Sequence, residues 1–200
     1  MRILVGCEFS GRVRDAFIAR GHDAVSCDIE PTETPGPHLQ CDLFEAIDEG
    51  SWDMLIFFWQ CTHMAVSGAK HFHRKQLRQA RDVMSFKLLM ECGIPRVAAE
   101  NPIGRLSTLY RKPDQIIQPW QFGHPQFKAT CLWLYGLPPL EPTNVLTPPA
   151  KGTAEHKAWS VVHREPPGPN RAKNRSRTFP GVADAMAARW SQFALSSEVA

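Results

Sequence analysis

The 200-residue sequence lacks several features that would place it in a class of proteins at once. It has no apolar run of about 18 residues, so no membrane-spanning helix is expected. Residues 1–5 enter a strand-like run without a charged region followed by a long apolar stretch, so no signal peptide is expected either. No internal repeat is visible. These absences leave a globular protein with enough chain for one hydrophobic core.

The six cysteines lack the spacings of a metal site or a redox pair. There is no CxxC pair and no zinc-ribbon spacing, so we expect free thiols in a reducing compartment, mostly as small buried hydrophobes. His63, His71 and His73 lie close together, but further ligands are missing, and no metal site is expected.

Positive charge is concentrated in residues 151–177. The net charge is +3, but this segment has seven lysines and arginines against Glu155 and Glu165. A basic stretch can follow a phosphate backbone, or it can be a solvated tail. Composition alone leaves both interpretations open.

The first hundred residues alternate between strand and helix patterns. Apolar runs at 3–7, 24–27, 53–58 and 96–99 predict buried strands, and residues 11–20 predict a helix with Val13, Ala16 and Phe17 on one face. Such β-α-β units imply a parallel sheet. We expect loops at 31–37 and 62–72, and a helix over 74–92. The predicted apolar stripe of that helix consists of Leu77, Ala80, Val83, Met84 and Leu88.

The second half has a different pattern. Residues 118–135 predict a β-hairpin or strand pair, with 131–135 the clearest strand. Residues 138–149 are proline-rich and predicted to be irregular, and 166–174 are predicted to be an exposed connector. From Phe179 onward the spacing predicts a closing helix, whose apolar residues are Val182, Ala185, Met186, Ala188 and Trp190.

Polar side chains follow four of the predicted strands. Glu8, Asp28, Cys61 and Glu100 each stand just past a strand end. In open α/β sheets the ligand lies outside the carboxyl ends of the strands, so these residues predict a site there.

The turn after the first strand, residues 6–11, opens a helix whose N-terminus favours negative charge. It does not match GxGxxG, so the dinucleotide fingerprint is absent. Asp28 is placed to accept hydrogen bonds from ribose hydroxyls, and Asp42 to meet an adenine amino group. Each is equally well interpreted as an ordinary loop carboxylate.

Cys61 and Glu100 suggest reaction chemistry. A thiol at a strand end is placed for nucleophilic attack if its pKa is lowered; otherwise Cys61 is a core cysteine that caps the strand. A poorly hydrated carboxyl at Glu100 has a raised pKa and can donate a proton. The alternative for Glu100 is a buried carboxylate satisfied by backbone groups.

Five segments resemble motifs of the cytosine-C5 DNA methyltransferase family, in the family's order and over nearly the whole chain. The similarity is closest to the short members found in bacteriophage genomes. The segments are 9–11 (Phe-Ser-Gly), 61–68 (Cys-Thr-His-Met-Ala-Val-Ser-Gly), 100–102 (Glu-Asn-Pro), 123–130 (Gly-His-Pro-Gln-Phe-Lys-Ala-Thr) and 178–181 (Thr-Phe-Pro-Gly).

The resemblance implies a Rossmann-like, SAM-dependent methyltransferase fold with a mostly parallel sheet, as a single domain over 1–200. It implies SAM as cofactor and DNA as partner, with the target cytosine flipped out of the helix. The implied catalytic residues are Cys61, Glu100 and Asn101. The implied cofactor-binding residues are Phe9, Ser10, Gly11, Asp28, Ile29 and Asp42. The implied substrate-binding residues are Ser67, Gly68, Gln126, Lys128, Arg175 and Arg177.

The chain departs from the family in three places. Trp59 and Gln60 stand where the family has two prolines before the cysteine, and proline fixes the backbone that aims the thiol. Lys128 and Thr130 replace two arginines. A short, basic, proline-rich insert at 136–177 stands in place of a full target-recognition domain, so we expect short or relaxed sequence specificity.

Two alternatives remain open beside methylation of DNA. One is a related enzyme that keeps the Cys61 adduct but acts on a free cytosine nucleotide, transfers another group or deaminates the base. The other is a degenerate relative that binds SAM or DNA without turnover. The expected location is the cytoplasm, that of the bacterial host if a phage encodes the chain.

Overall fold

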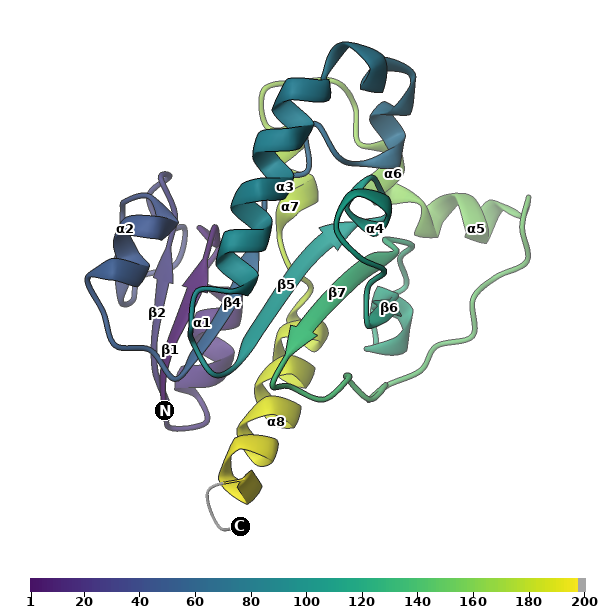
Figure 1. Ribbon diagram of the computed structural model, residues 1–200. Coiled ribbons are helices and arrows are strands. Elements are labelled where there is room, and N and C mark those ends of the chain that lie inside the picture. Colours follow the sequence, from purple (N-terminus) through teal and green to yellow (C-terminus); the bar gives the residue numbers. More distant parts are fainter. Residues whose placement is uncertain (198–200) are drawn as a thin grey trace.

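A seven-stranded sheet forms the centre of the protein, seen in a computed structural model that describes residues 1–197 (Figure 1). Its strands are β1 (Arg2–Gly6), β2 (Asp23–Cys27), β3 (His38–Leu39), β4 (Met54–Phe58), β5 (Val97–Pro102), β6 (Gln115–Ile117) and β7 (Thr130–Tyr135). The helices are α1 (Arg12–Ile18), α2 (Leu43–Asp48), α3 (Gln76–Met90), α4 (Leu106–Leu109), α5 (Ala154–Trp159), α6 (Val161–Arg164), α7 (Arg171–Ser176) and α8 (Pro180–Ser197), with 3-10 helices η1 (Val66–Arg74) and η2 (Pro119–Gln121).

The strand order is β3-β2-β1-β4-β5-β7-β6, and β7 alone runs antiparallel to its neighbours. This confirms the predicted α/β class with a mostly parallel sheet, and the arrangement is compatible with a Rossmann-like fold. The order reverses between β1 and β4. In such sheets the crevice for a ligand opens outside the carboxyl ends of the strands at this point.

Alternation along the strands divides the core into two layers. Ile3 and Val5 of β1 pack with α1 and α8, whereas Leu4 packs on the other face with α2 and α3. Successive side chains of a strand point to opposite faces, so both faces of a buried strand must be apolar and covered. The predicted faces of the first and last helices are confirmed, since Phe17 and Trp190 are fully buried in one cluster.

Three boundaries differ from the sequence prediction. The partner of β7 is β6 at Gln115–Ile117, before the predicted range, and 119–121 form a 3-10 turn because Pro119 cannot donate to a sheet. Part of the predicted 62–72 loop is η1, and the end of the predicted connector at 166–174 is α7. Residues 138–149 are irregular, as predicted.

The predicted apolar stripe of α3 is wrong. Leu77, Met84 and Leu88 are 83%, 60% and 54% exposed, whereas Gln79 and Asp82 are buried with Phe86 and Leu89. The helix turns its polar residues inward because Gln79 and Asp82 hydrogen-bond to the segment that follows β4. Hydrophobic periodicity does not predict this orientation of α3, because it takes no account of hydrogen bonds made by polar side chains.

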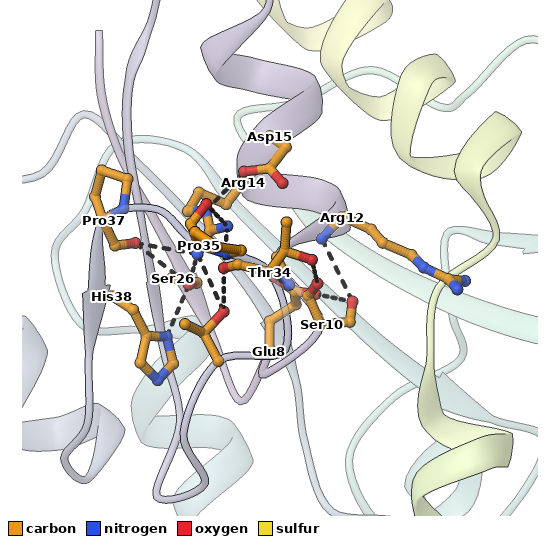
Figure 2. Close-up of polar contacts among 12 residues, drawn as sticks. Glu8, Ser10, Arg12, Arg14, Asp15, Ser26, Thr34, Pro35, Pro37 and His38 are labelled. Carbon is orange, nitrogen blue, oxygen red and sulfur yellow. Dashed lines mark hydrogen bonds and ion pairs between the residues drawn. The ribbon is translucent and has the colours of Figure 1, made fainter.

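The loop at 31–37 is held to α1 by a fully buried arginine (Figure 2). The Arg14 guanidinium donates to Ser26 Oγ at 3.0 Å, to the Thr34 carbonyl at 3.0 Å and to the Pro37 carbonyl at 3.5 Å. A Cβ on Gly11 would lie 2.4 Å from Arg14 Nη2, so only glycine leaves room for the guanidinium. Arg14, a residue type that is usually exposed to solvent, therefore orders the loop beside the predicted cofactor-binding residues.

We expect Arg14→Met to lower the free energy of unfolding by about 3 kcal/mol, because it leaves several buried acceptors without a donor. Urea unfolding measures this loss. Arg20→Met is the matched control, since Arg20 is exposed, and it should change the free energy by less than about 0.5 kcal/mol. A loss for Arg14→Met no larger than the control's would show that the buried network is not stabilising.

Candidate active site

Cys61 lies just past the carboxyl end of β4, in a segment that is fastened to the end of β5. Asn101 is fully buried, and its Nδ2 donates to the Trp59 carbonyl at 2.7 Å. The Arg105 N–H donates to the Met64 carbonyl at 2.8 Å, and the Val66 N–H to the Ile103 carbonyl at 2.9 Å. The Glu-Asn-Pro and cysteine segments therefore form one unit, and Cys61 itself is exposed.

Gly104 lets the two segments approach this closely. A Cβ at this position would lie 2.1 Å from the Met64 carbonyl oxygen. Real Cβ atoms do not come that close to backbone, so any side chain here would push the cysteine segment away from β5. The sequence alone does not mark Gly104 as a contact position.

Glu100 stands on β5 directly beside the end of β4, since Phe58 and Glu100 are register partners. Burial raises the pKa of Glu100, while Lys128 and a hydrogen bond with Thr130 lower it in part. The raised pKa was expected for a poorly hydrated carboxyl at this strand end. Glu100 can therefore carry a proton in a pH range where an exposed glutamate is ionised.

The charges of Glu100, Lys128 and Arg175 all act on the Cys61 thiol. The surrounding protein raises the pKa of Cys61 first, because it limits the hydration of the thiolate although the residue as a whole is exposed. The Glu100 carboxylate raises this pKa further, and Lys128 and Arg175 lower it. The structure thus brings together four residues predicted from separate parts of the sequence. Arg175 Nε is buried and has no hydrogen-bond partner in the described part of the chain.

A cavity of about 20 Å³ lies behind Glu100. Its lining includes Phe58 of β4, Thr130 of β7 and Val182 of α8, together with Lys128, Thr178 and Phe179, which precede β7 and α8. This is room for about one water molecule. The cavity is therefore too small to hold an organic ligand.

Two of the resembling segments, 123–130 and 178–181, meet in the structure. The Gly181 N–H donates to His124 Nε2 at 2.9 Å, and the rings of His124 and Phe179 lie 5.2 Å apart. Gln126 is half-buried in the same segment. The contact fixes the segment that carries Lys128.

The insert at 136–177 is anchored on the same segment. The Phe127 ring stacks at 4.8 Å from His156 and 5.5 Å from Trp159, and the Phe127 N–H donates to the Trp159 carbonyl at 3.0 Å. The insert leads through α5 and α6 to α7, whose Arg175 reaches the thiol's surroundings.

The acidic residues of the predicted cofactor region gather around Cys7. Burial and the charges of Asp28 and Asp42 raise the pKa of Cys7 to about 12. Asp28 is half-buried, and Asp42 caps α2 by accepting from the Phe44 N–H at 2.9 Å. Ile29 is 73% exposed beside them. These residues form an acidic region with an apolar edge at the carboxyl ends of β1 and β2.

The turn after β1 is closed by Glu8. Its buried carboxylate accepts from the Ser10 hydroxyl and from the Gly11 N–H (Figure 2). Burial raises the pKa of Glu8, and the hydrogen bond from Ser10 opposes that effect. Ser10 and Gly11 therefore build the turn from inside, whereas Phe9 stays partly exposed.

Phe9 is covered in part by α7 and the residue that follows it. Lys173 Nζ and Arg177 Cζ lie 4.7 and 5.8 Å from the Phe9 ring centroid. Arg177 also makes a bidentate pair with Glu33, at 2.8 and 2.6 Å. Arg177, predicted to bind substrate, is thus tied to the 31–37 loop in this structure.

Ser67 and Gly68, which were predicted to bind substrate, lie in η1 and not in the cluster around Cys61. Ser67 is exposed there. The prediction from sequence did not include Gln79 and Asp82, two residues of α3 that hold the cysteine segment. The only available signal was their spacing of three residues, which places both on one helical face.

Within residues 1–197, no group of three or more His, Cys, Asp or Glu side chains is arranged to hold a metal ion. Among the described helices, none has the length and apolar character needed to cross a bilayer. No protein-family model matches the chain, and no curated protein matches it.

Proposed function

We propose that the chain transfers a methyl group from SAM to C5 of cytosine in DNA, through a covalent bond between Cys61 and C6 of the base. The observation that carries this proposal is the meeting of Cys61 and Glu100 at the ends of adjacent parallel strands, with Lys128 and Arg175 beside the thiol. The sheet order, with one antiparallel strand between β5 and β6, also fits the methyltransferase fold that the resemblance implies.

The donor set around β1 and β2 fits SAM. Asp28 and Asp42 retain acceptor capacity for ribose hydroxyls and an amino group, because a carboxylate has about four lone-pair sites. Their negative charges favour a ligand that carries positive charge on sulfur and nitrogen. Phe9 and Ile29 offer apolar surface for the adenine ring. When bound, SAM supplies the methyl group.

The proposed reaction uses Cys61 and Glu100 in sequence. The Cys61 thiolate forms a bond to C6 of cytosine, and Glu100 gives its proton to N3, so that C5 becomes nucleophilic. C5 then takes the methyl group from the sulfonium sulfur, with S-adenosylhomocysteine as the leaving group. A water-mediated base removes the C5 proton, the bond between Cys61 and C6 breaks to return the thiolate, and N3 gives its proton back to Glu100. A cytosine in a duplex must first be flipped out, with the segment at 62–72 closing around it.

The deciding experiment measures transfer of labelled methyl from SAM to duplex DNA, single-stranded DNA and cytosine mononucleotide, with the product bases identified by mass. We expect 5-methylcytosine in DNA with the wild-type chain and none with Cys61→Ser, because a hydroxyl is a far weaker nucleophile at this position. Full methylation by Cys61→Ser would refute the covalent mechanism. Cys92→Ser is the control, since Cys92 lies outside this cluster at the end of α3.

The raised pKa of Cys61 favours one alternative, a relative that binds DNA or SAM without turnover, because a protonated thiol does not attack. Binding of both ligands with no product from any of the three substrates would support it. Product from the mononucleotide alone would support an enzyme of free nucleotides.

A further inference from the structure

The segment around Cys61 is held from two sides, and the second side is α3. Gln60 Nε2 donates to Asp82 Oδ1 at 2.9 Å, and Gln79 Nε2 donates to the His63 carbonyl at 2.9 Å. Lys75, which directly precedes α3, donates from Nζ to the Thr62 carbonyl at 3.1 Å. Residues 60, 62 and 63 are therefore all bonded to α3 or its cap, and Cys61 lies between them.

These contacts come at the expense of the hydrophobic packing of α3. Gln79 and Asp82 are 3% and 5% exposed, while Leu77 and Met84 face outward. Burying a carboxylate and an amide is unfavourable unless they are hydrogen-bonded, and exposing two large apolar side chains forfeits further stabilisation. An orientation of the helix with Leu77 and Met84 inward would avoid both costs. The observed orientation is thus explained by what Gln79 and Asp82 bind.

The contact of Gln60 is made by the residue directly before Cys61. Proline would fix this position through its ring, but the chain has glutamine. Across residues 1–197, no hydrogen bond uses the Gln60 N–H. Among the described residues, the side-chain bond to Asp82 is the only hydrogen bond that Gln60 itself makes, while the peptide before it is held through the Trp59 carbonyl by Asn101.

Asp82 and His63 also form an incompletely bonded pair. Asp82 Oδ2 and His63 Nδ1 are buried, and neither has a hydrogen-bond partner in the described residues. Burial raises the pKa of Asp82, and His63 lowers it, so the two groups act on each other electrostatically. Asp82 therefore lies near the cysteine segment at His63 as well as at Gln60.

We propose that Asp82, through Gln60, is a positioning residue that holds the Cys61 thiol against Glu100. This inference depends on Cys61 being the nucleophile of the proposed function. Asp82 itself does not touch the reacting atoms. A displacement of about 1 Å at a reacting group costs roughly 100-fold in rate, so loss of the contact should be visible in turnover.

The test compares Asp82→Ala, Asp82→Asn and Gln60→Ala with Met84→Ala. Asparagine keeps an acceptor for Gln60, and Met84 is an exposed residue of the same helix. Gln60 is itself exposed, so Gln60→Ala tests the same contact with little risk to folding. Two readouts are needed: methyl transfer from SAM to DNA, and the pH dependence of Cys61 alkylation by iodoacetamide, followed at the Cys61 peptide by mass.

We expect Asp82→Ala and Gln60→Ala each to lower kcat by roughly 30- to 100-fold with the KM for SAM unchanged. Both should also lower the pKa of Cys61, because the thiol moves away from the Glu100 charge. Asp82→Asn and Met84→Ala should stay close to wild type in both readouts. The kcat of the double variant Gln60→Ala/Asp82→Ala should be no lower than that of either single variant, since both substitutions remove the same contact.

The proposal is wrong if Gln60→Ala and Asp82→Ala alkylate with the pH profile of Met84→Ala. The alkylation readout does not require methyl transfer. If the wild type methylates nothing but the profiles shift as expected, the proposed function fails and the positioning role stands.

Discussion

Glu100→Gln should abolish most methyl transfer and at the same time make Cys61 more reactive toward alkylating agents. The two effects have opposite signs because Glu100 has two influences on the site. In the proposed reaction it is the acid that gives a proton to the base, and loss of a general acid costs roughly 10²- to 10⁴-fold in rate. As a carboxylate it raises the pKa of Cys61, and glutamine removes that charge.

The pH dependence follows from the directions of the two pKa shifts. The thiolate is present above the raised pKa of Cys61, and protonated Glu100 is present below its own raised pKa. The wild-type kcat/KM should therefore fall on both sides of an optimum, and its two apparent pKa values belong to the pair. Glu100→Gln should lose the alkaline fall of the profile.

Steady-state transfer and peptide-level alkylation measure both effects in one preparation. Glu91→Gln makes the same chemical change at an exposed position after α3 and serves as the control. If Glu100→Gln slows transfer but leaves the alkylation profile unchanged, the two side chains do not interact as the structure indicates.

DNA binding should weaken by roughly 10³-fold between about 50 and 200 mM salt if the cationic surface meets about six phosphates. Each phosphate that is neutralised adds about 0.9 to the slope of log K against log salt. The candidate residues are Lys128 and Arg175, whose charges act on Cys61, and the basic residues of α5 and α7.

Two arginines of this surface should behave differently. Arg175→Gln should lower the salt slope by about 0.9, because its charge is available near the thiol. Arg177→Gln should leave the slope nearly unchanged, because Arg177 is already neutralised by Glu33 at 2.6 Å. Fluorescence anisotropy with a labelled duplex over the same salt range measures both. A flat salt dependence, or equal losses for the two variants, would contradict this description of the surface.

The strands that the sequence predicted well are those buried on both faces. β1 and β4 are nearly continuous apolar runs between turn signals, and β2 and β5 are largely apolar; such runs have few other interpretations. β3 has two residues and α2 has six, so neither is long enough to show a period. β6 was misplaced because its three residues carry little pattern of their own.

The candidate site was predictable in part for a geometric reason. Parallel strands end at one edge of the sheet, so residues that follow β4 and β5 must lie near each other, as Cys61 and Glu100 do. The supporting residues were not predictable. Arg14 and Asp82 are charged residues in helices, which are normally exposed, and their burial depends on partners far away in the sequence.

The pairing of α1 with α8 has a consequence for synthesis of the protein. α1 ends at residue 18 and α8 begins at residue 180, 162 positions later, yet they pack in one apolar cluster on the same face of the sheet (Figure 1). At about 5–20 residues per second, a ribosome needs roughly 8 to 32 s to make the intervening chain. During that time the inner side of α1, with Val13 and Phe17, has no cover from α8. The nascent chain is therefore a target for chaperones and for aggregation until its final helix emerges.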